Sequence, residues 1–172
     1  YSCFACATID FSLQRPARMR RASTNYYHNM TLALTTLAAR GYSRIGYVLT
    51  DVGSARQEEL SLAAYLLFRR RNPSICLPPF TASAATPFRD LTEWVRRTAP
   101  DAVITNDFSL PADLGPCRDR VPERLGCVTL ARPADTCAGT AHVDENCPQV
   151  GAQAVDMIVD AIHRNDFGLP ES

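Results

Sequence analysis

The chain has 172 residues, which fits one domain or one complete lobe with part of another. Its composition, 46% hydrophobic and 21% charged, is typical of a globular protein and argues against disorder. Eighteen basic residues balance eighteen acidic ones, so the basic surplus of a stand-alone nucleic-acid-binding protein is missing. No apolar run approaches the roughly 20 residues that cross a bilayer, and no secretory pattern opens the sequence. We therefore expect no membrane partner, and a segment upstream of Tyr1, because the sequence starts inside a predicted strand.

Seven cysteines are an odd number, and we expect them to be reduced and mostly buried in a cytoplasmic protein. Cys3 and Cys6 have the spacing of a redox dithiol, but redox pairs lie where a strand turns into a helix. Here the pair lies at the entry to a predicted strand, where the two side chains point to opposite faces. A second such pair, which a zinc site would need, is missing. We interpret these cysteines as structural.

The first half of the chain predicts strands and helices in alternation. Residues 4–9 indicate a short buried strand, followed by a polar, arginine-rich connection over 12–25. A helix is expected from Met30 to a glycine stop at Gly41, with an apolar face made of Leu32, Leu34, Leu37 and Ala38. Residues 45–49 then read as a core strand.

A Ser-x-x-Gln capping box at 54–57 predicts the next helix, through Phe68, which Asn72 and Pro73 end. Residues 74–77 indicate a short strand, halted by two prolines. Another helix is expected to start at 86–90, with three side chains facing inward: Leu91, Trp94 and Val95.

Two further strands are predicted at 102–105 and 126–130, with a weak helix over 109–117 between them. Asn146 is expected to cap a long final helix with the apolar stripe Val150, Ala154, Met157, Ile158 and Ile162. This alternation predicts an α/β fold, a parallel sheet with helices on both faces. Ligands of such sheets bind beyond the carboxyl ends of the strands, which are here residues 50–54, 105–108 and 131–134.

The sequence gives little support to catalysis. Only three histidines are present, and no Gly-x-Ser-x-Gly, His-Glu-x-x-His or phosphate-binding glycine loop occurs. We therefore expect no enzymatic activity, no metal and no cofactor. Asn29-Met30-Thr31 matches a glycosylation triplet, which has no meaning in a cytoplasmic chain.

Polar residues gather where the cleft is expected. Asn25, Tyr26, Tyr27 and His28 precede the first predicted helix, and Asn106 and Asp107 end a strand. Amides, carboxylates and tyrosines are side chains that orient a small ligand. The alternative is that 106–109 is an ordinary turn and the tyrosines are surface packing, since turns favour the same residues.

Four segments together resemble the LacI/GalR-type transcriptional regulators. Residues 29–49, NMTLALTTLAARGYSRIGYVL, resemble that family's helix and Arg-Ile-Gly strand, and 100–107, PDAVITND, a strand end. Residues 120–130 resemble its Val-Pro strand entry, and 144–169 its last long helix and the loop after it. Each motif is weak alone, but the four follow one another in the family's order and spacing.

The resemblance implies a periplasmic-binding-protein type I fold, mainly its C-terminal lobe, without the helix-turn-helix head. Residues 1–21 would end the N-terminal-lobe segment and cross over, 22–135 would form the C-terminal lobe, and 136–172 would hold a crossover and the last helix near the lobe junction. The implied function is allosteric sensing of a small-molecule effector, with a sugar as the expected class. The implied partners are a second copy in a homodimer and operator DNA, reached only through the missing head.

The family's effector contacts carry over incompletely. Asn106 matches an amide that commonly contacts the effector, whereas the usual arginine falls at Ser61 and the usual aspartate before the first helix at Asn25. The acidic residue after the Val-Pro strand falls at Ala131, followed by Arg132, so an atypical ligand is one reading. The candidate effector-binding residues are Asn25, Tyr26, Tyr27, Ser61, Asn106, Asp107, Arg132 and Glu145.

Two other functions are compatible with this fold class. A solute-binding protein of the same fold would need a secretory signal, and seven cysteines would be awkward in an oxidising compartment. A small α/β enzyme would need an acid–base pair that only coordinates can reveal.

Overall fold

The computed structural model describes residues 3–10, 19–50, 59–82, 90–106, 125–130 and 141–168. The chain divides into two compact units. We call residues 26–145 the central unit, and residues 1–25 with 146–172 the terminal unit. The assignment of these units to lobes of a larger sensor stays a prediction.

The central unit holds a five-stranded sheet in the order β4-β3-β5-β6-β7, in which every pair of neighbours is parallel. Its strands are β3 (Ile45–Thr50), β4 (Phe80–Ala82), β5 (Ala102–Thr105), β6 (Gly126–Thr129) and β7 (Ala141–His142). The non-consecutive order is a crossover topology, so strands connected through helices can all run the same way. The predicted parallel α/β fold is confirmed.

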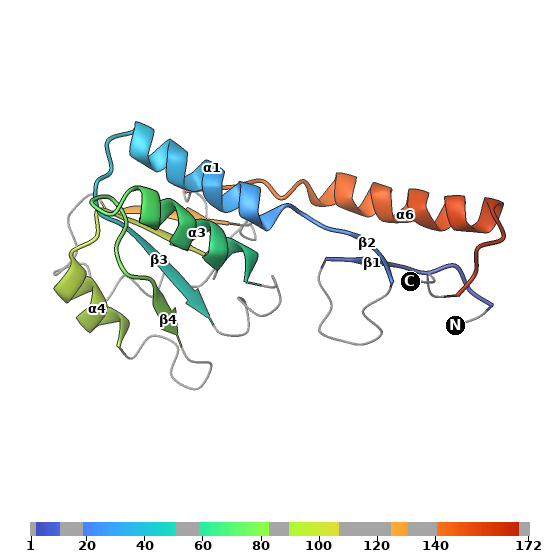
Figure 1. Ribbon diagram of the computed structural model, residues 1–172, viewed down its shortest axis with the longest axis horizontal. Helices are drawn as coiled ribbons and strands as arrows, with labels where there is room; N and C mark the ends of the chain where they lie inside the picture. The colour runs from blue at the N-terminus through green and yellow to red at the C-terminus, as the bar shows by residue number, and fades with distance from the viewer. Residues whose placement is uncertain are drawn as a thin grey trace. The chain divides into compact units, whose positions relative to one another are not determined.

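Helices pack on both faces of this sheet (Figure 1). On one face, α1 (Tyr26–Ala39) and α3 (Leu60–Arg71) pack over Ile45, Tyr47 and Leu49 of β3. On the other face, α4 (Leu91–Thr98) places Trp94 against Val48. Alternate residues of one strand thus face two separate apolar clusters, which is why β3 is apolar at nearly every position.

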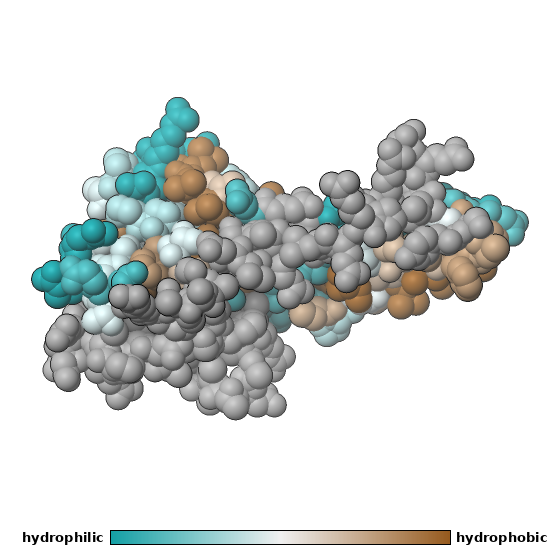
Figure 2. Space-filling view, turned by 90° about the horizontal axis from the view of Figure 1, so that it is seen from below, coloured by the Kyte–Doolittle hydropathy of each residue, from teal (hydrophilic) through white to brown (hydrophobic). Residues whose placement is uncertain are grey.

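The terminal unit is smaller and leaves much apolar surface exposed. Its strands β1 (Ala7–Ile9) and β2 (Arg20–Ala22) pair in parallel, and α6 (Cys147–His163) packs against both. Figure 2 shows apolar side chains on the visible face of this unit. The exposed apolar side chains here are Phe4, Ile9, Val155, Val159, Ile162 and Phe167. A two-stranded sheet with one helix is too small to bury them all.

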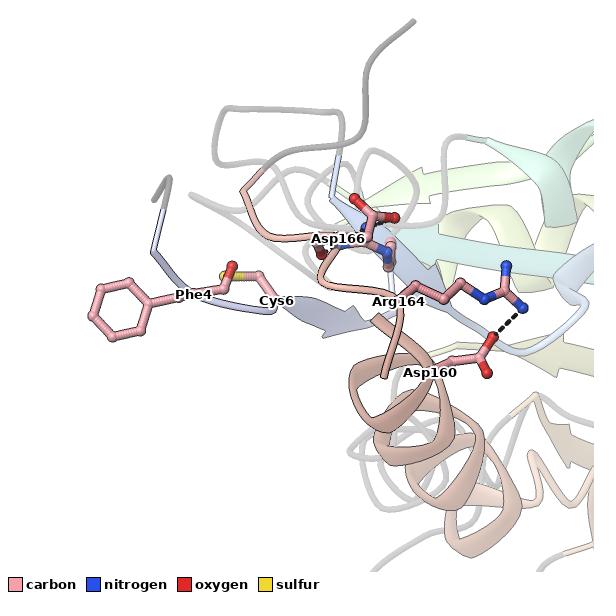
Figure 3. Close-up of polar contacts among 6 residues, drawn as sticks. Phe4, Cys6, Asp160, Arg164 and Asp166 are labelled. Carbon is pink, nitrogen blue, oxygen red and sulfur yellow. Dashed lines mark hydrogen bonds and ion pairs between the residues drawn. The ribbon is translucent and has the colours of Figure 1, made fainter. Parts of the chain in front are cut away.

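Ion pairs and one backbone bond tie the end of α6 to its surroundings within this unit. Arg164 pairs with Asp160 one helical turn earlier, at 2.8 Å (Figure 3). Arg20 of β2 pairs with Asp166 at 2.5 Å, and the Gly168 amide donates to the Phe4 carbonyl at 2.9 Å. These contacts hold the chain after α6 against β1 and β2.

Several predicted features of the central unit need correction. Helix α1 begins at Tyr26, four residues before the predicted start, so the two tyrosines and His28 form its first turn. Leu32, predicted to face inward, is 46% exposed, because the buried face follows Tyr26, Met30, Ala33, Leu34 and Leu37. The strand expected at 74–77 reduces to a single bridge between Cys76 and Ile45, and β4 follows the two prolines instead.

The terminal unit also departs from prediction. The strand predicted as buried at 4–9 is shorter, and its Ile9 is 58% exposed. Strand β2 forms inside the segment predicted as a connection, because its backbone pairs with β1. In α6, Ile162 is 49% exposed while Ala161 is buried, and Asn146 precedes the helix in a left-handed conformation without capping it through its side chain.

Other predictions hold. Gly41 ends the first helix region with a φ of +87°, Asn72 ends α3, and the three predicted inward residues of α4 are buried. The described cysteines are free, but only Cys76 among them is buried, so the expectation of mostly buried thiols is wrong for this part of the chain. The capping box at 54–57, the helix start at 86–89 and the weak helix at 109–117 lie outside the described residues. No helix of the described ranges has the length and apolarity to cross a membrane.

Candidate functional site

Asn106 directly follows β5, the central strand of the sheet. The strands on either side hold this position firmly: Thr105 pairs with Val48 of β3 and with Thr129 of β6. Both threonines are fully buried, and the Leu130 amide donates to the Thr105 carbonyl at 2.9 Å. The carboxyl end of a central parallel strand, where ligands of this fold class bind, is therefore a rigid platform for Asn106.

The amide of Asn106 is enclosed without a partner among the described residues. Both Nδ2 and Oδ1 are buried, and neither makes a hydrogen bond within that part of the chain. An unpaired buried polar atom costs about 1–3 kcal/mol, so native proteins rarely keep both ends of an amide unsatisfied. An amide in this state is a donor and an acceptor held ready for a ligand.

Ser61 and Tyr47 lie beneath the same edge, between β3 and α3. Ser61 is in the first turn of α3 and is 1% exposed. Burial raises the pKa of the Tyr47 hydroxyl, and the neighbouring Ser61 side chain offsets part of that rise. The Tyr47 ring packs on Tyr65 of α3, with ring centroids 5.3 Å apart. Ser61 is thus placed in the core against a tyrosine, and the exposed-face role of an arginine at this position has no counterpart in it.

The other predicted site residues are spread over the two units. Asn25 belongs to the terminal unit and is exposed. In the central unit, Tyr26 is buried in the core at 4% exposure, Tyr27 is 40% exposed on α1, and Glu145 is half-buried after β7. The expectation that Tyr26 lies on a surface before the helix is wrong, because the helix starts there. Asp107 and Arg132 lie outside the described residues.

The Arg-Ile-Gly and Pro-Asp-Ala segments meet at the opposite, amino edge of the sheet. The Asp101 carboxylate accepts hydrogen bonds from the Ser43 amide at 2.8 Å, the Ser43 hydroxyl at 3.1 Å and the Arg44 amide at 2.9 Å. The Arg44 guanidinium donates to the carbonyls of Ala99 and Thr98 at the end of α4. These motif residues therefore align β3 with β5 and are structural.

Two polar residues that matter were missed from the sequence. Tyr47 was read only as part of a core strand, and Asn29 only as part of a glycosylation triplet, yet Asn29 is 7% exposed. Its spacing from Ala33 and Leu37 places it on the buried face of α1, which was the available signal. Among the described ranges, no group of three or more histidine, cysteine or acidic side chains is arranged to hold a metal ion.

No protein-family model matches the sequence, and none of the curated proteins matches it. Solved structures match its fold. A dimeric Lac repressor with a C-terminal deletion superimposes with a TM-score of 0.71 at 15% identity, over 96% of this chain and 64% of that one. A LacI family transcriptional regulator from Lactobacillus casei with bound glucose gives 0.69 at 17% identity, over 96% and 67%. A transcription regulator-like protein from Staphylococcus haemolyticus gives 0.68 at 16% identity, over 90% and 58%.

This chain has the LacI-type effector-binding fold. The structural likeness extends over nearly the whole chain, as the ordered motifs led us to expect. The chain spans 58% and 64% of the length of two of these structures. In the LacI-type fold, as in other parallel α/β sheets, Asn106 occupies the edge at which ligands bind.

Proposed function

We propose that the chain is the ligand-sensing portion of a LacI-type transcriptional regulator and binds a small-molecule effector at the carboxyl edge of its central sheet. The observation that carries this proposal is Asn106, whose buried donor and acceptor have no partner among the described residues. A ligand that supplies both partners would recover the energy that the empty site forfeits. The LacI-type fold adds the role, because the matched proteins are transcription regulators.

A sugar-like effector fits the chemistry of this amide. A hydroxyl group can donate and accept at once, so two neighbouring hydroxyls of a sugar can satisfy Nδ2 and Oδ1 of Asn106 together. The Lactobacillus casei regulator of the same fold was solved with glucose and with sucrose. Discrimination would come from the buried amide, since a ligand without hydroxyls leaves it unpaired.

The terminal unit supports an organisation in two lobes. Its exposed apolar side chains, including Val155 and Val159 at 58% and 44%, need a covering surface. We propose that further chain of the regulator completes this unit as the second lobe, so that effector binding closes the two lobes and shifts the affinity for operator DNA. Operator contact would come from a separate DNA-binding head, and the sensor would act as a homodimer.

A thermal-shift screen of the whole protein against monosaccharides and disaccharides tests the proposal. A bound sugar should raise the melting temperature in a concentration-dependent way, by an amount that corresponds to about 2.7 kcal/mol at a hundredfold excess over Kd. Asn106→Ala should weaken the binding of that sugar by tenfold or more. Gln153→Ala, which removes an exposed amide from α6, serves as the control and should leave affinity unchanged. Equal affinity of Asn106→Ala and the parent protein would contradict the proposal.

A further inference from the structure

A cavity of about 520 Å³ lies inside the central unit, between one side of α1 and the strands β6 and β7. Apolar side chains form much of its wall, among them Leu32, Leu37, Val128 and Val143. The volume falls within the range of about 300–1,000 Å³ in which proteins hold small organic ligands. None of the described candidate effector residues lines it, so it is separate from the site at Asn106.

The sheet and helix arrangement explains why this space stays open. Helix α3 packs beside α1 over β3, whereas β7 is only two residues long and forms the edge of the sheet (Figure 1). The flank of α1 that faces β6 and β7 therefore has less to pack against. Gly126 deepens the wall, because the Tyr42 ring occupies the space of a side chain there: a methyl group at position 126 would lie 2.9 Å from the Tyr42 hydroxyl oxygen.

Asn29 places an unsatisfied donor in this cavity. The residue lines the cavity from α1 and is 7% exposed, and its Nδ2 has no hydrogen-bond partner among the described residues. A buried amide nitrogen facing mainly apolar walls would be replaced at little cost by a leucine if it served packing alone. Its presence calls for an oxygen acceptor from outside the chain.

We propose that this cavity is a second ligand site, which binds a small organic molecule with an apolar body and a carbonyl-type oxygen. The body lies along Leu37 and Val128, and the oxygen accepts a hydrogen bond from Asn29 Nδ2. The site does not depend on the proposed effector function, because it stands on the cavity and on the unpaired donor.

Two probes of nearly equal shape isolate the hydrogen bond. Acetophenone carries a carbonyl where ethylbenzene carries a methylene, so NMR titration of the isotope-labelled chain with each compares the same body with and without the acceptor. Acetophenone should shift the side-chain amide signals of Asn29 and bind about fivefold more tightly than ethylbenzene, which corresponds to one net neutral hydrogen bond. Equal affinity for the two probes, or shifts confined to residues outside the cavity, would overturn the proposal.

Variants on α1 test the location. Thr36 is exposed, lines the cavity and follows Asn29 by two turns on the same helix face, so Thr36→Trp should fill the space and weaken acetophenone binding at least tenfold. Thr35→Trp, the matched control, places the same indole at an exposed position that does not line the cavity, and should bind acetophenone as before. Asn29→Leu should stay folded and lose the preference for acetophenone over ethylbenzene. A retained preference in Asn29→Leu would refute the assigned donor.

Discussion

The indole of Trp94 lies directly against the backbone of Gly46, at a point where a methyl group would come within 2.4 Å of the ring carbon Cη2. The ring cannot easily withdraw: its Nε1 donates to the Pro78 carbonyl at 3.2 Å, and Phe80 packs on it at 5.8 Å between ring centroids. The Arg-Ile-Gly sequence therefore carries glycine because α4 and β3 approach too closely there for a side chain.

Gly46→Ala should destabilise the chain by about 1–3 kcal/mol, the usual cost of overpacking a filled core. Urea unfolding followed by circular dichroism measures this as a lower midpoint. Gly151→Ala is the matched control, since nothing lies within 4 Å of the added methyl group in α6. Alanine is the better helix former, so this variant should gain about 0.5–1 kcal/mol. Shifts of the same sign in both variants would contradict the packing argument.

Asp101→Ala should cost about 1–3 kcal/mol, because it leaves the Ser43 and Arg44 amides without their acceptor at the amino edge of β3. The same urea titration measures the loss. Effector affinity should not change, because this edge is opposite to the proposed site. Glu93→Ala removes an exposed carboxylate that pairs with Arg96 and should have little effect on stability. A larger effect of Asp101→Ala on ligand binding than on stability would show that the residue is functional.

Tyr65→Phe tests the attachment of α3 to the sheet. The Tyr65 hydroxyl lies 2.9 Å from the Ile45 carbonyl and 2.7 Å from the Leu77 carbonyl, and it donates to them. Loss of this buried hydroxyl should lower the free energy of unfolding by about 1 kcal/mol. Tyr27→Phe, at a side chain 40% exposed, should change it by less than about 0.5 kcal/mol. If the two variants unfold alike, the hydroxyl does not hold α3 in place.

Cys76 should make stability depend on pH in the alkaline range. Burial raises the pKa of its thiol from 9.0 to about 11, and Arg69 lowers it only in part. The unfolded chain releases this proton near pH 9 while the folded chain keeps it, so the contribution is complete below pH 9 and is lost as the pH rises toward 11.

Comparison with Cys76→Ala isolates this effect from other titrating groups. The stability difference between the parent chain and the variant, from urea titrations at intervals between pH 8 and pH 10.5, should shift against the parent as the pH rises. A difference that stays constant over this range would contradict the assignment. In labelling with iodoacetamide, Cys76 should react far more slowly than the exposed Cys3 and Cys147.

The sequence alone determined the fold class and the main elements of the central unit. Apolar runs such as 45–49 and 102–105 predict buried parallel strands, and Gly41 and Asn72 mark where helices end, because these signals act within a few residues. The ordered motifs likewise predicted the LacI-type fold. Asn106 could be selected as a site residue, since its place after a strand is a local feature.

The tertiary structure decided which residues face which partner. Strand β2 forms because β1 lies beside it, and Tyr26 belongs to the core because α1 starts earlier than its apolar pattern indicated. The cavity beside Asn29 and the contact between Gly46 and Trp94 join residues that lie far apart in the chain. Such features depend on the distances between packed elements, which no local pattern of residues encodes.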